Sequence, residues 1–316
     1  MLLPACLKPG DTIGIIAPSS PVDRDAIVQA TDLISGRGYR VTLGDNLLKT
    51  MQGNSYLAGT DAERAADIHQ VFVRDDVKAI FCARGGYGFM RLFDLLDWNL
   101  IAAHPKIVTG YSDITSLHLA LNQTAGMVSF HGPNATSLTR LDATSSDLFW
   151  SLLESPKVQG TLPVEPTTLK TLVPGTATAP LAGGCICLLA HACGSRHTPI
   201  FENKIVLLED VHEAIYRVDR DLIQLRNAGA FEGARGFVIG TISHWQDHEK
   251  ANDPPSNTPD ALWNDIIAPL GKPTVAGFPF GHEPNPMTLP LGIVATLDAT
   301  NRTLSLMEPA VQDIRP

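Results

Sequence analysis

The hydrophobic and polar positions in the first half of the chain predict strands that alternate with helices. Residues 11–17 form an apolar, β-branched run, and residues 23–35 then carry Ile27, Ala30 and Ile34 at helical spacing. The alternation continues with strands over 39–43, 79–82 and 106–110 and helices over 60–73, 90–96 and 114–121, the first of which opens on a Thr60–Glu63 capping box. This order predicts a mainly parallel sheet with helices on both faces.

The second half begins with a different composition and then returns to the same pattern. Residues 151–180 are rich in proline, threonine and glycine without a helical period, which predicts a linker with edge strands. The pattern then predicts strands over 204–208 and 236–240, a helix over 217–228 and a hairpin over 295–306. We therefore expect an α/β protein of two domains, 1–150 and 181–316, with a cleft between them as the place for a small-molecule site.

Composition narrows the class of function. The chain has 316 residues, 44% of them hydrophobic and 18% charged, and its formal net charge is -9, which argues against a nucleic-acid partner. No apolar run is long enough to span a membrane, and prolines interrupt the first residues in a way that does not predict a signal peptide. Cys185, Cys187 and Cys193 lie close in sequence, but the C-x-C spacing fits zinc poorly, so all five cysteines are expected as free thiols in a reducing cytoplasm.

Ser112 lies between the strand predicted over 106–110 and the helix predicted over 114–121. Gly110 permits a sharp turn there, and a serine at such a turn projects its hydroxyl from the sheet edge near the first helical amides. A second interpretation is that Ser112 merely caps the helix, as serines often do. The local pattern leaves both interpretations open.

A serine nucleophile needs a base and an acid that orients the base. Glu209 directly follows the strand predicted over 204–208, and His282 lies in a rigid loop of glycines and prolines. His69 and His118 fall on predicted helices, and His244 and His248 fall in a polar stretch, so all four are poorer bases. His212 stays a competitor because it is close to Glu209 in sequence.

The glycine-rich segment Arg84-Gly-Gly-Tyr-Gly88 follows a predicted strand, so its backbone amides can approach a ligand closely. It is not the G-x-G-x-x-G of dinucleotide sites. Its amides can instead supply half of an oxyanion hole, with the amide of Asp113 as the other half. Ile114 occupies the position of the second glycine in G-x-S-x-G, which counts against an ordinary α/β-hydrolase.

Several motifs occur together in one order and resemble a known family. They are Gly10-Asp-Thr-Ile-Gly-Ile-Ile-Ala-Pro-Ser-Ser20, Arg84-Gly-Gly-Tyr-Gly88, Gly110-Tyr-Ser-Asp113, Leu208-Glu-Asp-Val211 with Tyr216-Arg217 and Asp219-Arg220, and Gly281-His282 with Leu289-Pro-Leu-Gly292. This set resembles the LD-carboxypeptidases of serine peptidase family S66, which include the microcin C immunity peptidases. The resemblance covers residues 10 to 306.

The resemblance implies a flavodoxin-like N-terminal domain, a smaller C-terminal α/β domain, a homodimer, and neither a metal nor an organic cofactor. It implies hydrolysis of the bond to the terminal D-alanine of murein tetrapeptides during peptidoglycan recycling. It further implies Ser112 as nucleophile, His282 as base and Glu209 as the orienting acid, with Gly86 and Asp113 supplying the oxyanion hole. Because a carboxypeptidase must bind a free carboxylate, Arg84 is expected either to bind it or to brace the glycine loop.

Two departures leave the substrate preference open. The chain has Gly183-Gly-Cys-Ile186 where the family usually has Gly-Gly-Asn-Leu, and Ile215 stands where a proline is common. Two alternatives to a murein carboxypeptidase stay open: a microcin-type peptidase that cleaves aminoacyl-nucleotide amides, and a non-catalytic binding protein with two α/β lobes. The short linker ranks the microcin-type peptidase behind murein carboxypeptidase.

Overall fold

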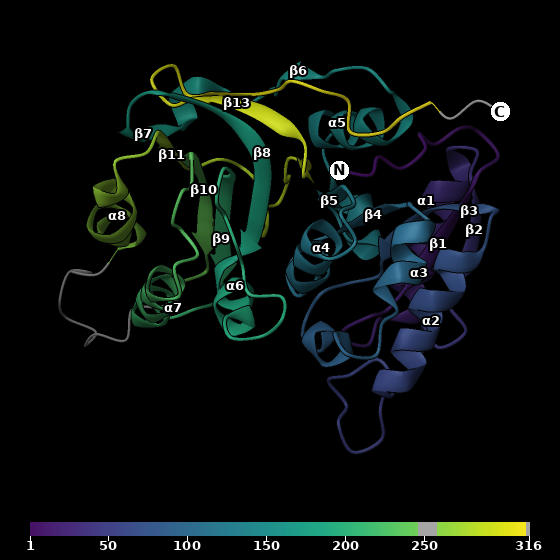
Figure 1. Ribbon diagram of the computed structural model, residues 1–316. Helices are drawn as coiled ribbons and strands as arrows, with labels where there is room; N and C mark the ends of the chain where they lie inside the picture. Colours follow the sequence, from purple (N-terminus) through teal and green to yellow (C-terminus); the bar gives the residue numbers. More distant parts are fainter. Residues whose placement is uncertain (246–257, 314–316) are drawn as a thin grey trace. The chain divides into compact units, whose positions relative to one another are not determined.

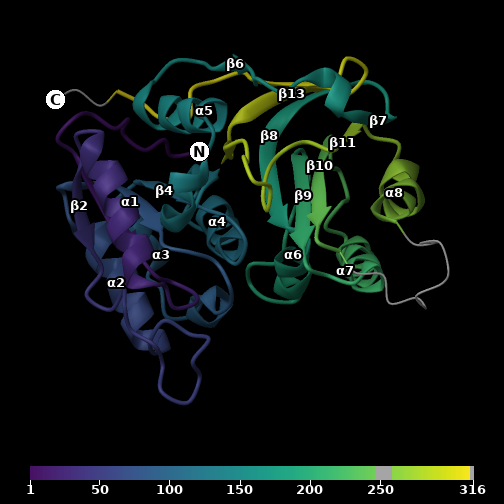
Figure 2. The same cartoon turned by 180° about the vertical axis from the view of Figure 1, so that it is seen from behind.

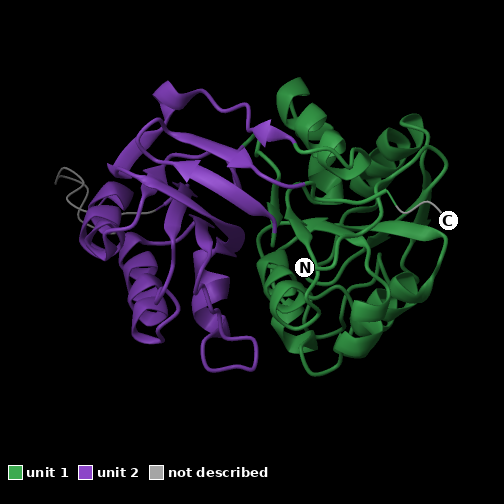
Figure 3. Ribbon diagram, turned by 45° about the horizontal axis from the view of Figure 1, so that its top comes forward, with its two compact units in different colours: residues 1–158, 284–292, 309–316 green, residues 159–283, 293–308 purple. Residues whose placement is uncertain are grey.

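The chain folds into two compact units, and two segments near its C-terminal end belong to the first unit. The computed structural model describes residues 1–245 and 258–313. Unit 1 consists of residues 1–158, 284–292 and 309–316, and unit 2 of residues 159–283 and 293–308 (Figure 3).

Unit 1 is built on a six-stranded sheet in the order β12-β5-β4-β3-β1-β2. Figure 1 labels β1 to β5 of this sheet. Its strands are β1 (Thr12–Ile16), β2 (Arg40–Leu43), β3 (Val77–Cys82), β4 (Ile107–Gly110), β5 (Ser129–His131) and β12 (Leu289–Leu291). All pairs are parallel except β12 with β5. The predicted parallel sheet is therefore confirmed, and β12 adds an antiparallel edge from a distant part of the chain.

The helices of unit 1 follow the predicted alternation only in part. They are α1 (Arg24–Gly36), α2 (Asp61–Val73), α3 (Trp98–Ala103), α4 (Ile114–Gln123) and α5 (Ala143–Glu154), with 3₁₀ turns η1 (Phe89–Leu92) and η2 (Ala135–Arg140). The Thr60–Glu63 capping box opens α2 as predicted. The helix predicted over 90–96 is only the short η1, and the pattern missed α3 and α5.

Side chains alternate between the two faces of β3, as the period of a strand requires. Ile80 and Cys82 belong to the apolar cluster formed with α2, α3 and α4. Phe81 points to the opposite face, where its ring packs on Phe149 and Trp150 of α5. The sheet is thus covered on both faces, which explains its continuous apolar strands.

Unit 2 contains an eight-stranded mixed sheet in the order β6-β14-β13-β8-β9-β10-β11-β7. Its strands are β6 (Gly160–Thr161), β7 (Lys170–Val173), β8 (Thr176–Cys185), β9 (Ile205–Val211), β10 (Gly236–Ser243), β11 (Thr274–Ala276), β13 (Val294–Asp298) and β14 (Thr303–Leu306). The strands from β8 to β11 are parallel, and the others pair antiparallel. The proline-rich stretch supplies both edge strands, β6 and β7, and the predicted hairpin is β13–β14.

The helices of unit 2 pack against its parallel strands. They are α6 (Ile186–Ala192), α7 (Ile215–Asn227) and α8 (Pro259–Leu262), which continues into a π-helical turn (Trp263–Ile267) and a 3₁₀ turn (Ala268–Leu270); a further 3₁₀ turn spans Pro166–Thr168. Leu189 of α6 and Leu222 of α7 share a buried cluster with Val206, Leu208 and Phe237. Figure 2 shows α6 and α7 close to β9 and β10. The predicted α/β fold class is confirmed. Within the described residues, no helix combines the length and apolarity needed to cross a membrane.

β8 and β9 approach each other so closely at Gly183 that a side chain would not fit there. This glycine pairs with Leu207 and has a φ of +129°, and a Cβ placed there would overlap the Leu207 carbonyl oxygen. Gly194 also has a positive φ (+87°), but no atom lies within 4 Å of its ideal Cβ. We expect Gly183→Ala to lower the free energy of unfolding by at least about 3 kcal/mol and Gly194→Ala by about 1 kcal/mol. Chemical denaturation measures both changes, and equal losses would contradict this account.

Candidate active site

Ser112 occupies a strained turn between β4 and α4. Its φ of 68° lies in the left-handed region, which costs a non-glycine residue about 1 kcal/mol or more. The turn closes on a hydrogen bond from the Thr115 amide to the Ser112 carbonyl (2.8 Å). Backbone strain of this kind persists only where the surrounding structure imposes it, and it is concentrated at functional sites.

The interpretation of Ser112 as a helix cap is wrong. The N-cap of α4 is Asp113, and no side chain caps the helix. Within the described parts of the chain, the Ser112 hydroxyl has no hydrogen-bond partner, and the residue is half-buried. The strained serine therefore presents a hydroxyl that the fold does not use for its own stability.

The glycine loop packs directly against Ser112. A Cβ placed on Gly85 would lie 2.6 Å from the Ser112 Cβ and 2.9 Å from its Oγ, so only glycine fits there. Ser20 holds the loop from the other side, because its amide donates to the Gly85 carbonyl (3.3 Å) and its Oγ accepts from the Tyr87 amide (3.1 Å). The next residue, Gly86, is exposed with a φ of +106°.

Two backbone amides beside Ser112 are available to an added acceptor. Within residues 1–245 and 258–313, neither the N–H of Gly86 nor that of Asp113 donates to a protein acceptor. Both residues belong to segments that contact or adjoin Ser112. Unpaired amides next to a free hydroxyl are the elements from which an oxyanion hole is built.

The Asp113 side chain has a role that the sequence did not indicate. Its carboxylate is buried and accepts hydrogen bonds from Ser19 Oγ (2.6 Å) and the Phe89 amide (2.8 Å). Burial raises the pKa of Asp113, although both hydrogen bonds and the charge of Arg64 oppose that shift. Asp113 thereby joins the segments that follow β1, β3 and β4.

A buried arginine in α2 holds the same loops. Arg64 donates from Nη1 to the carbonyls of Pro18 and Gly88 and pairs with Asp61, and it is 1% exposed. Nothing in the local sequence distinguishes Arg64 from a surface arginine of an amphipathic helix. Arg84 is exposed and donates to the Pro21 carbonyl (3.3 Å), which fits the bracing role considered for it.

Glu209 and His282 form a hydrogen-bonded pair within unit 2. His282 Nδ1 lies 2.7 Å from Glu209 Oε2, and the His282 amide donates to the same oxygen (3.3 Å). Glu209 is fully buried in β9, two residues before the strand ends, and Gly281, with a φ of +82°, leaves the space that the carboxylate fills. With Nδ1 bonded to the carboxylate, the imidazole is fixed in orientation and its other nitrogen, Nε2, can accept a proton.

The carboxylate also controls the proton affinity of the histidine. Burial is the largest single influence and lowers the pKa of His282, but the charge and hydrogen bond of Glu209, together with the charge of Asp210, raise it above 6.5 overall. Asp210 is itself buried, and burial and the neighbouring Glu209 charge raise its pKa to about 7. Because Glu209 stabilises the protonated form of His282, the imidazole accepts a proton more readily. An oriented imidazole with a raised pKa can therefore act as a general base.

Within the described residues, the histidines weighed against His282 have other contacts. His212 is exposed and its ring stacks on His244, with ring centroids 4.8 Å apart. His118 is fully buried with Nε2 on the Gly110 carbonyl (2.8 Å), and burial and the charge of His131 lower its pKa to about 3. His69 accepts from the Asp97 amide through Nε2 (2.9 Å), and His248 lies outside the described residues.

The predicted site residues therefore fall into two sets. Ser112, Gly86, Asp113 and Arg84 belong to unit 1, and Glu209 and His282 belong to unit 2. Each set is brought together within its own unit by residues far apart in the sequence.

Comparison with known proteins identifies relatives along nearly the whole chain. Residues 13–132 match the family model described as the LD-carboxypeptidase N-terminal domain, and residues 178–297 match that of the C-terminal domain. The "probable murein peptide carboxypeptidase" of Bacillus subtilis is 35% identical, covering 98% of this chain and 95% of its own.

Solved structures show the same fold. An MccF-like protein from Bacillus anthracis has a TM-score of 0.85 at 26% identity, covering 98% of this chain and all of its own. A muramoyltetrapeptide carboxypeptidase from Oxalobacter formigenes has a TM-score of 0.80 at 29% identity, covering 93% of this chain and 97% of its own.

The strain at Ser112 can be measured directly. Ser112→Gly removes the Cβ that disfavours a positive φ, so we expect the free energy of unfolding to rise by about 1 kcal/mol. Ser112→Ala keeps the Cβ and should leave stability within about 0.5 kcal/mol of the native protein. Chemical denaturation of both variants tests this, and equal stabilities of the glycine and alanine variants would show that the turn is not strained.

The titration of His282 tests its coupling to Glu209. Glu209→Gln removes the negative charge that raises the pKa of His282 against the lowering effect of burial, so we expect this pKa to fall. The NMR chemical shifts of the His282 ring protons measure it. Glu213→Gln is the control, because Glu213 pairs with Arg217 and has no bond to His282. Since the folded-state pKa is raised, the pair stabilises the native protein below about pH 6.5 and loses that contribution as the pH rises through the folded pKa. An unchanged His282 pKa in Glu209→Gln would refute the coupling.

Proposed function

The chain belongs to the LD-carboxypeptidase family, peptidase family S66, and from this we propose that it is a serine carboxypeptidase that removes the terminal D-alanine of murein tetrapeptides. The observation that carries the catalytic part is the 2.7 Å hydrogen bond between His282 and the buried Glu209. A histidine that acts as the base in acyl transfer needs a carboxylate to orient its ring, and the buried Glu209 provides one.

We propose that Ser112, His282 and Glu209 act as one triad. His282 Nε2 takes the proton of the Ser112 hydroxyl, and the oxygen attacks the carbonyl carbon of the bond that precedes the terminal D-residue. Glu209 keeps Nδ1 protonated and stabilises the imidazolium. His282 then gives the proton to the leaving amine, and the D-amino acid departs. Water, deprotonated by His282, hydrolyses the remaining acyl-serine and regenerates the hydroxyl.

The amides of Gly86 and Asp113 are the proposed oxyanion hole. The observations that support this assignment all lie in unit 1. Among the described residues neither N–H group has a protein acceptor, and both groups belong to segments that contact or adjoin Ser112. Asp113 contributes its backbone to the reaction, while its buried carboxylate positions the loops. Loss of one such donor typically costs about 3 to 4 kcal/mol of transition-state stabilisation.

Two considerations support the proposed substrate class: the names of the relatives, and the need of a carboxypeptidase to bind the free C-terminal carboxylate of its substrate. The Bacillus subtilis relative is named for murein peptides, and the Oxalobacter formigenes structure is named a muramoyltetrapeptide carboxypeptidase. We propose that Arg84, whose guanidinium is exposed, binds the substrate carboxylate while its bond to Pro21 holds it in place.

A second candidate substrate is an aminoacyl-nucleotide amide of the microcin type. It is supported by the MccF-like structure, which shares the fold at a TM-score of 0.85. Incubation with a diaminopimelate-containing tetrapeptide and, separately, with an aminoacyl-sulfamoyl nucleotide distinguishes the two. Mass spectrometry should show release of D-alanine from the first alone.

Three variants test the catalytic roles. Ser112→Ala should reduce kcat by at least about ten thousandfold, and Glu209→Gln should reduce it less, because Nδ1 keeps an acceptor. In the native protein kcat/KM should rise as the pH passes through the raised pKa of His282, and Glu209→Gln should move this limb to lower pH. Ser116→Ala, on α4 and outside the proposed triad, is the matched control. Wild-type turnover by Ser112→Ala would overturn the mechanism, whereas bound but uncleaved peptide would favour the binding-protein alternative.

The homodimer implied by the resemblance and the cytoplasmic location expected from the free thiols stay predictions.

A further inference from the structure

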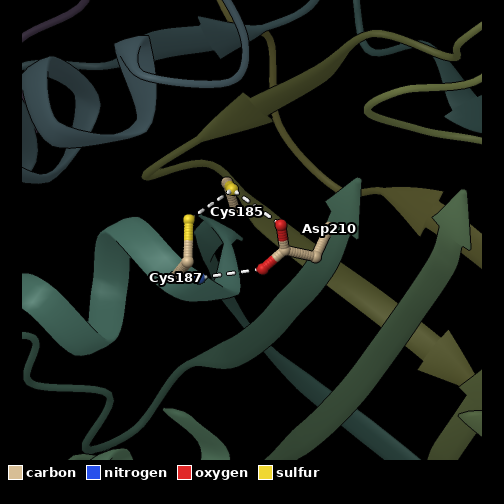
Figure 4. A group of neighbouring side chains, drawn as sticks. All are labelled: Cys185, Cys187 and Asp210. Carbon is tan, nitrogen blue, oxygen red and sulfur yellow. Dashed lines mark hydrogen bonds between the residues drawn. The ribbon is translucent and has the colours of Figure 1, made fainter. Parts of the chain in front are cut away.

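Three side chains of types that ligate metals, none of them in the proposed triad, lie together in unit 2. Cys185 ends β8, Cys187 lies in the first turn of α6, and Asp210 lies at the end of β9 (Figure 4). The ligand atoms of all three lie within 4.8 Å of one another. We propose that these residues bind a zinc-type divalent cation through two thiolates and one carboxylate.

The distances between the donor atoms match those of a tetrahedral zinc site. With Zn–S bonds of about 2.3 Å and Zn–O bonds of about 2.0 to 2.2 Å, a tetrahedron has S–S edges of about 3.8 Å and S–O edges of about 3.5 to 3.6 Å. The two sulfur atoms are 3.6 Å apart, and Cys185 Sγ is 3.5 Å from Asp210 Oδ1. The remaining edge, from Cys187 Sγ to the Asp210 carboxylate, is at most 4.8 Å, so it is the edge that would have to shorten when an ion binds.

The carboxylate is held in place before any ion arrives. Asp210 Oδ2 accepts the Cys187 amide (2.9 Å), and Oδ1 accepts the Val211 amide (2.8 Å). These bonds orient the ligand in the way that outer hydrogen bonds do in metal sites. Cys185 is held equally firmly, because its backbone pairs with Glu209 in the parallel β8–β9 ladder.

Burial and charge also favour a cation at this place. Cys185 and Asp210 are 2% and 1% exposed, and among the described residues no lysine, arginine or histidine side chain pairs with Asp210. A positive ion bound beside the buried carboxylate and the two thiols would offset the cost of burying negative charge there. Zn²⁺ would displace the thiol protons to solvent, and thiolate donors select zinc over magnesium or calcium.

The half-buried Cys187 provides the side from which an ion and a water ligand can reach the cluster. Three protein ligands leave the fourth tetrahedral position for that water. Occupancy would link the ends of β8 and β9 to the first turn of α6. This proposal does not depend on the identity of the peptidase substrate.

Cobalt titration of the full-length protein tests the proposal. Reduced, chelator-treated protein should bind one Co²⁺ per chain, with thiolate-to-cobalt charge-transfer absorption and the intense visible bands of tetrahedral Co²⁺, and Zn²⁺ should displace it. Cys187→Ser should weaken binding at least about a hundredfold, since even outer-sphere changes cost tenfold to a hundredfold. Cys193→Ser is the matched control, because that thiol lies at the other end of α6 and bonds to the Leu189 carbonyl.

Asp210→Asn keeps the shape of the third ligand and should also weaken Co²⁺ binding, with circular dichroism confirming that each variant is folded. Absence of a tetrahedral spectrum at one equivalent, or an unchanged affinity in Cys187→Ser, would overturn the proposal. A reduced protein that binds no Co²⁺ but loses two hydrogens on exposure to air would identify the pair as a disulfide couple instead, which also overturns it.

Discussion

A carboxylate inside a protein must be surrounded by hydrogen-bond donors or give up its charge, and this constraint organises both units. In unit 1 the buried Asp113 binds Ser19 and the Phe89 amide, so the loops after three strands are held by one side chain. In unit 2 the fully buried Glu209 receives both the ring and the amide of His282. The residues proposed for chemistry are thus positioned by groups whose burial would be costly if those bonds were absent.

Close packing around these groups depends on glycine. Gly85 lies so near Ser112 that a methyl group would collide with the proposed nucleophile, and Gly281 leaves the space occupied by the Glu209 carboxylate. Ser112 itself adopts a left-handed φ that glycine would adopt without cost. The chain retains a serine there at the expense of stability, which agrees with a role for its hydroxyl beyond the fold.

The strongly periodic elements of the fold could be predicted from the sequence, but their assembly could not. The alternation of strands and helices indicated the parallel sheet of unit 1, and the Thr60–Glu63 capping box marked the start of α2. The short helices α3 and α6 were missed, because one or two turns carry too little periodicity to detect, and the longer α5 was missed as well. The return of residues 284–292 to unit 1, where β12 pairs with β5, depends on contacts between segments far apart in the chain.

For the site, the sequence by itself determined which residue types stood at the ends of strands and in glycine-rich turns, and it left two local questions open. They were whether Ser112 caps α4 and which histidine pairs with Glu209. Tertiary structure assigned the cap of α4 to Asp113 and gave Glu209 the distant His282 as its hydrogen-bond partner. It also placed Asp210 beside the C-x-C thiols, which the sequence did not indicate. The physical reason is the same in each case: propensity and periodicity act over a few neighbouring residues, whereas hydrogen bonds and side-chain contacts depend on distances that only the packed chain defines.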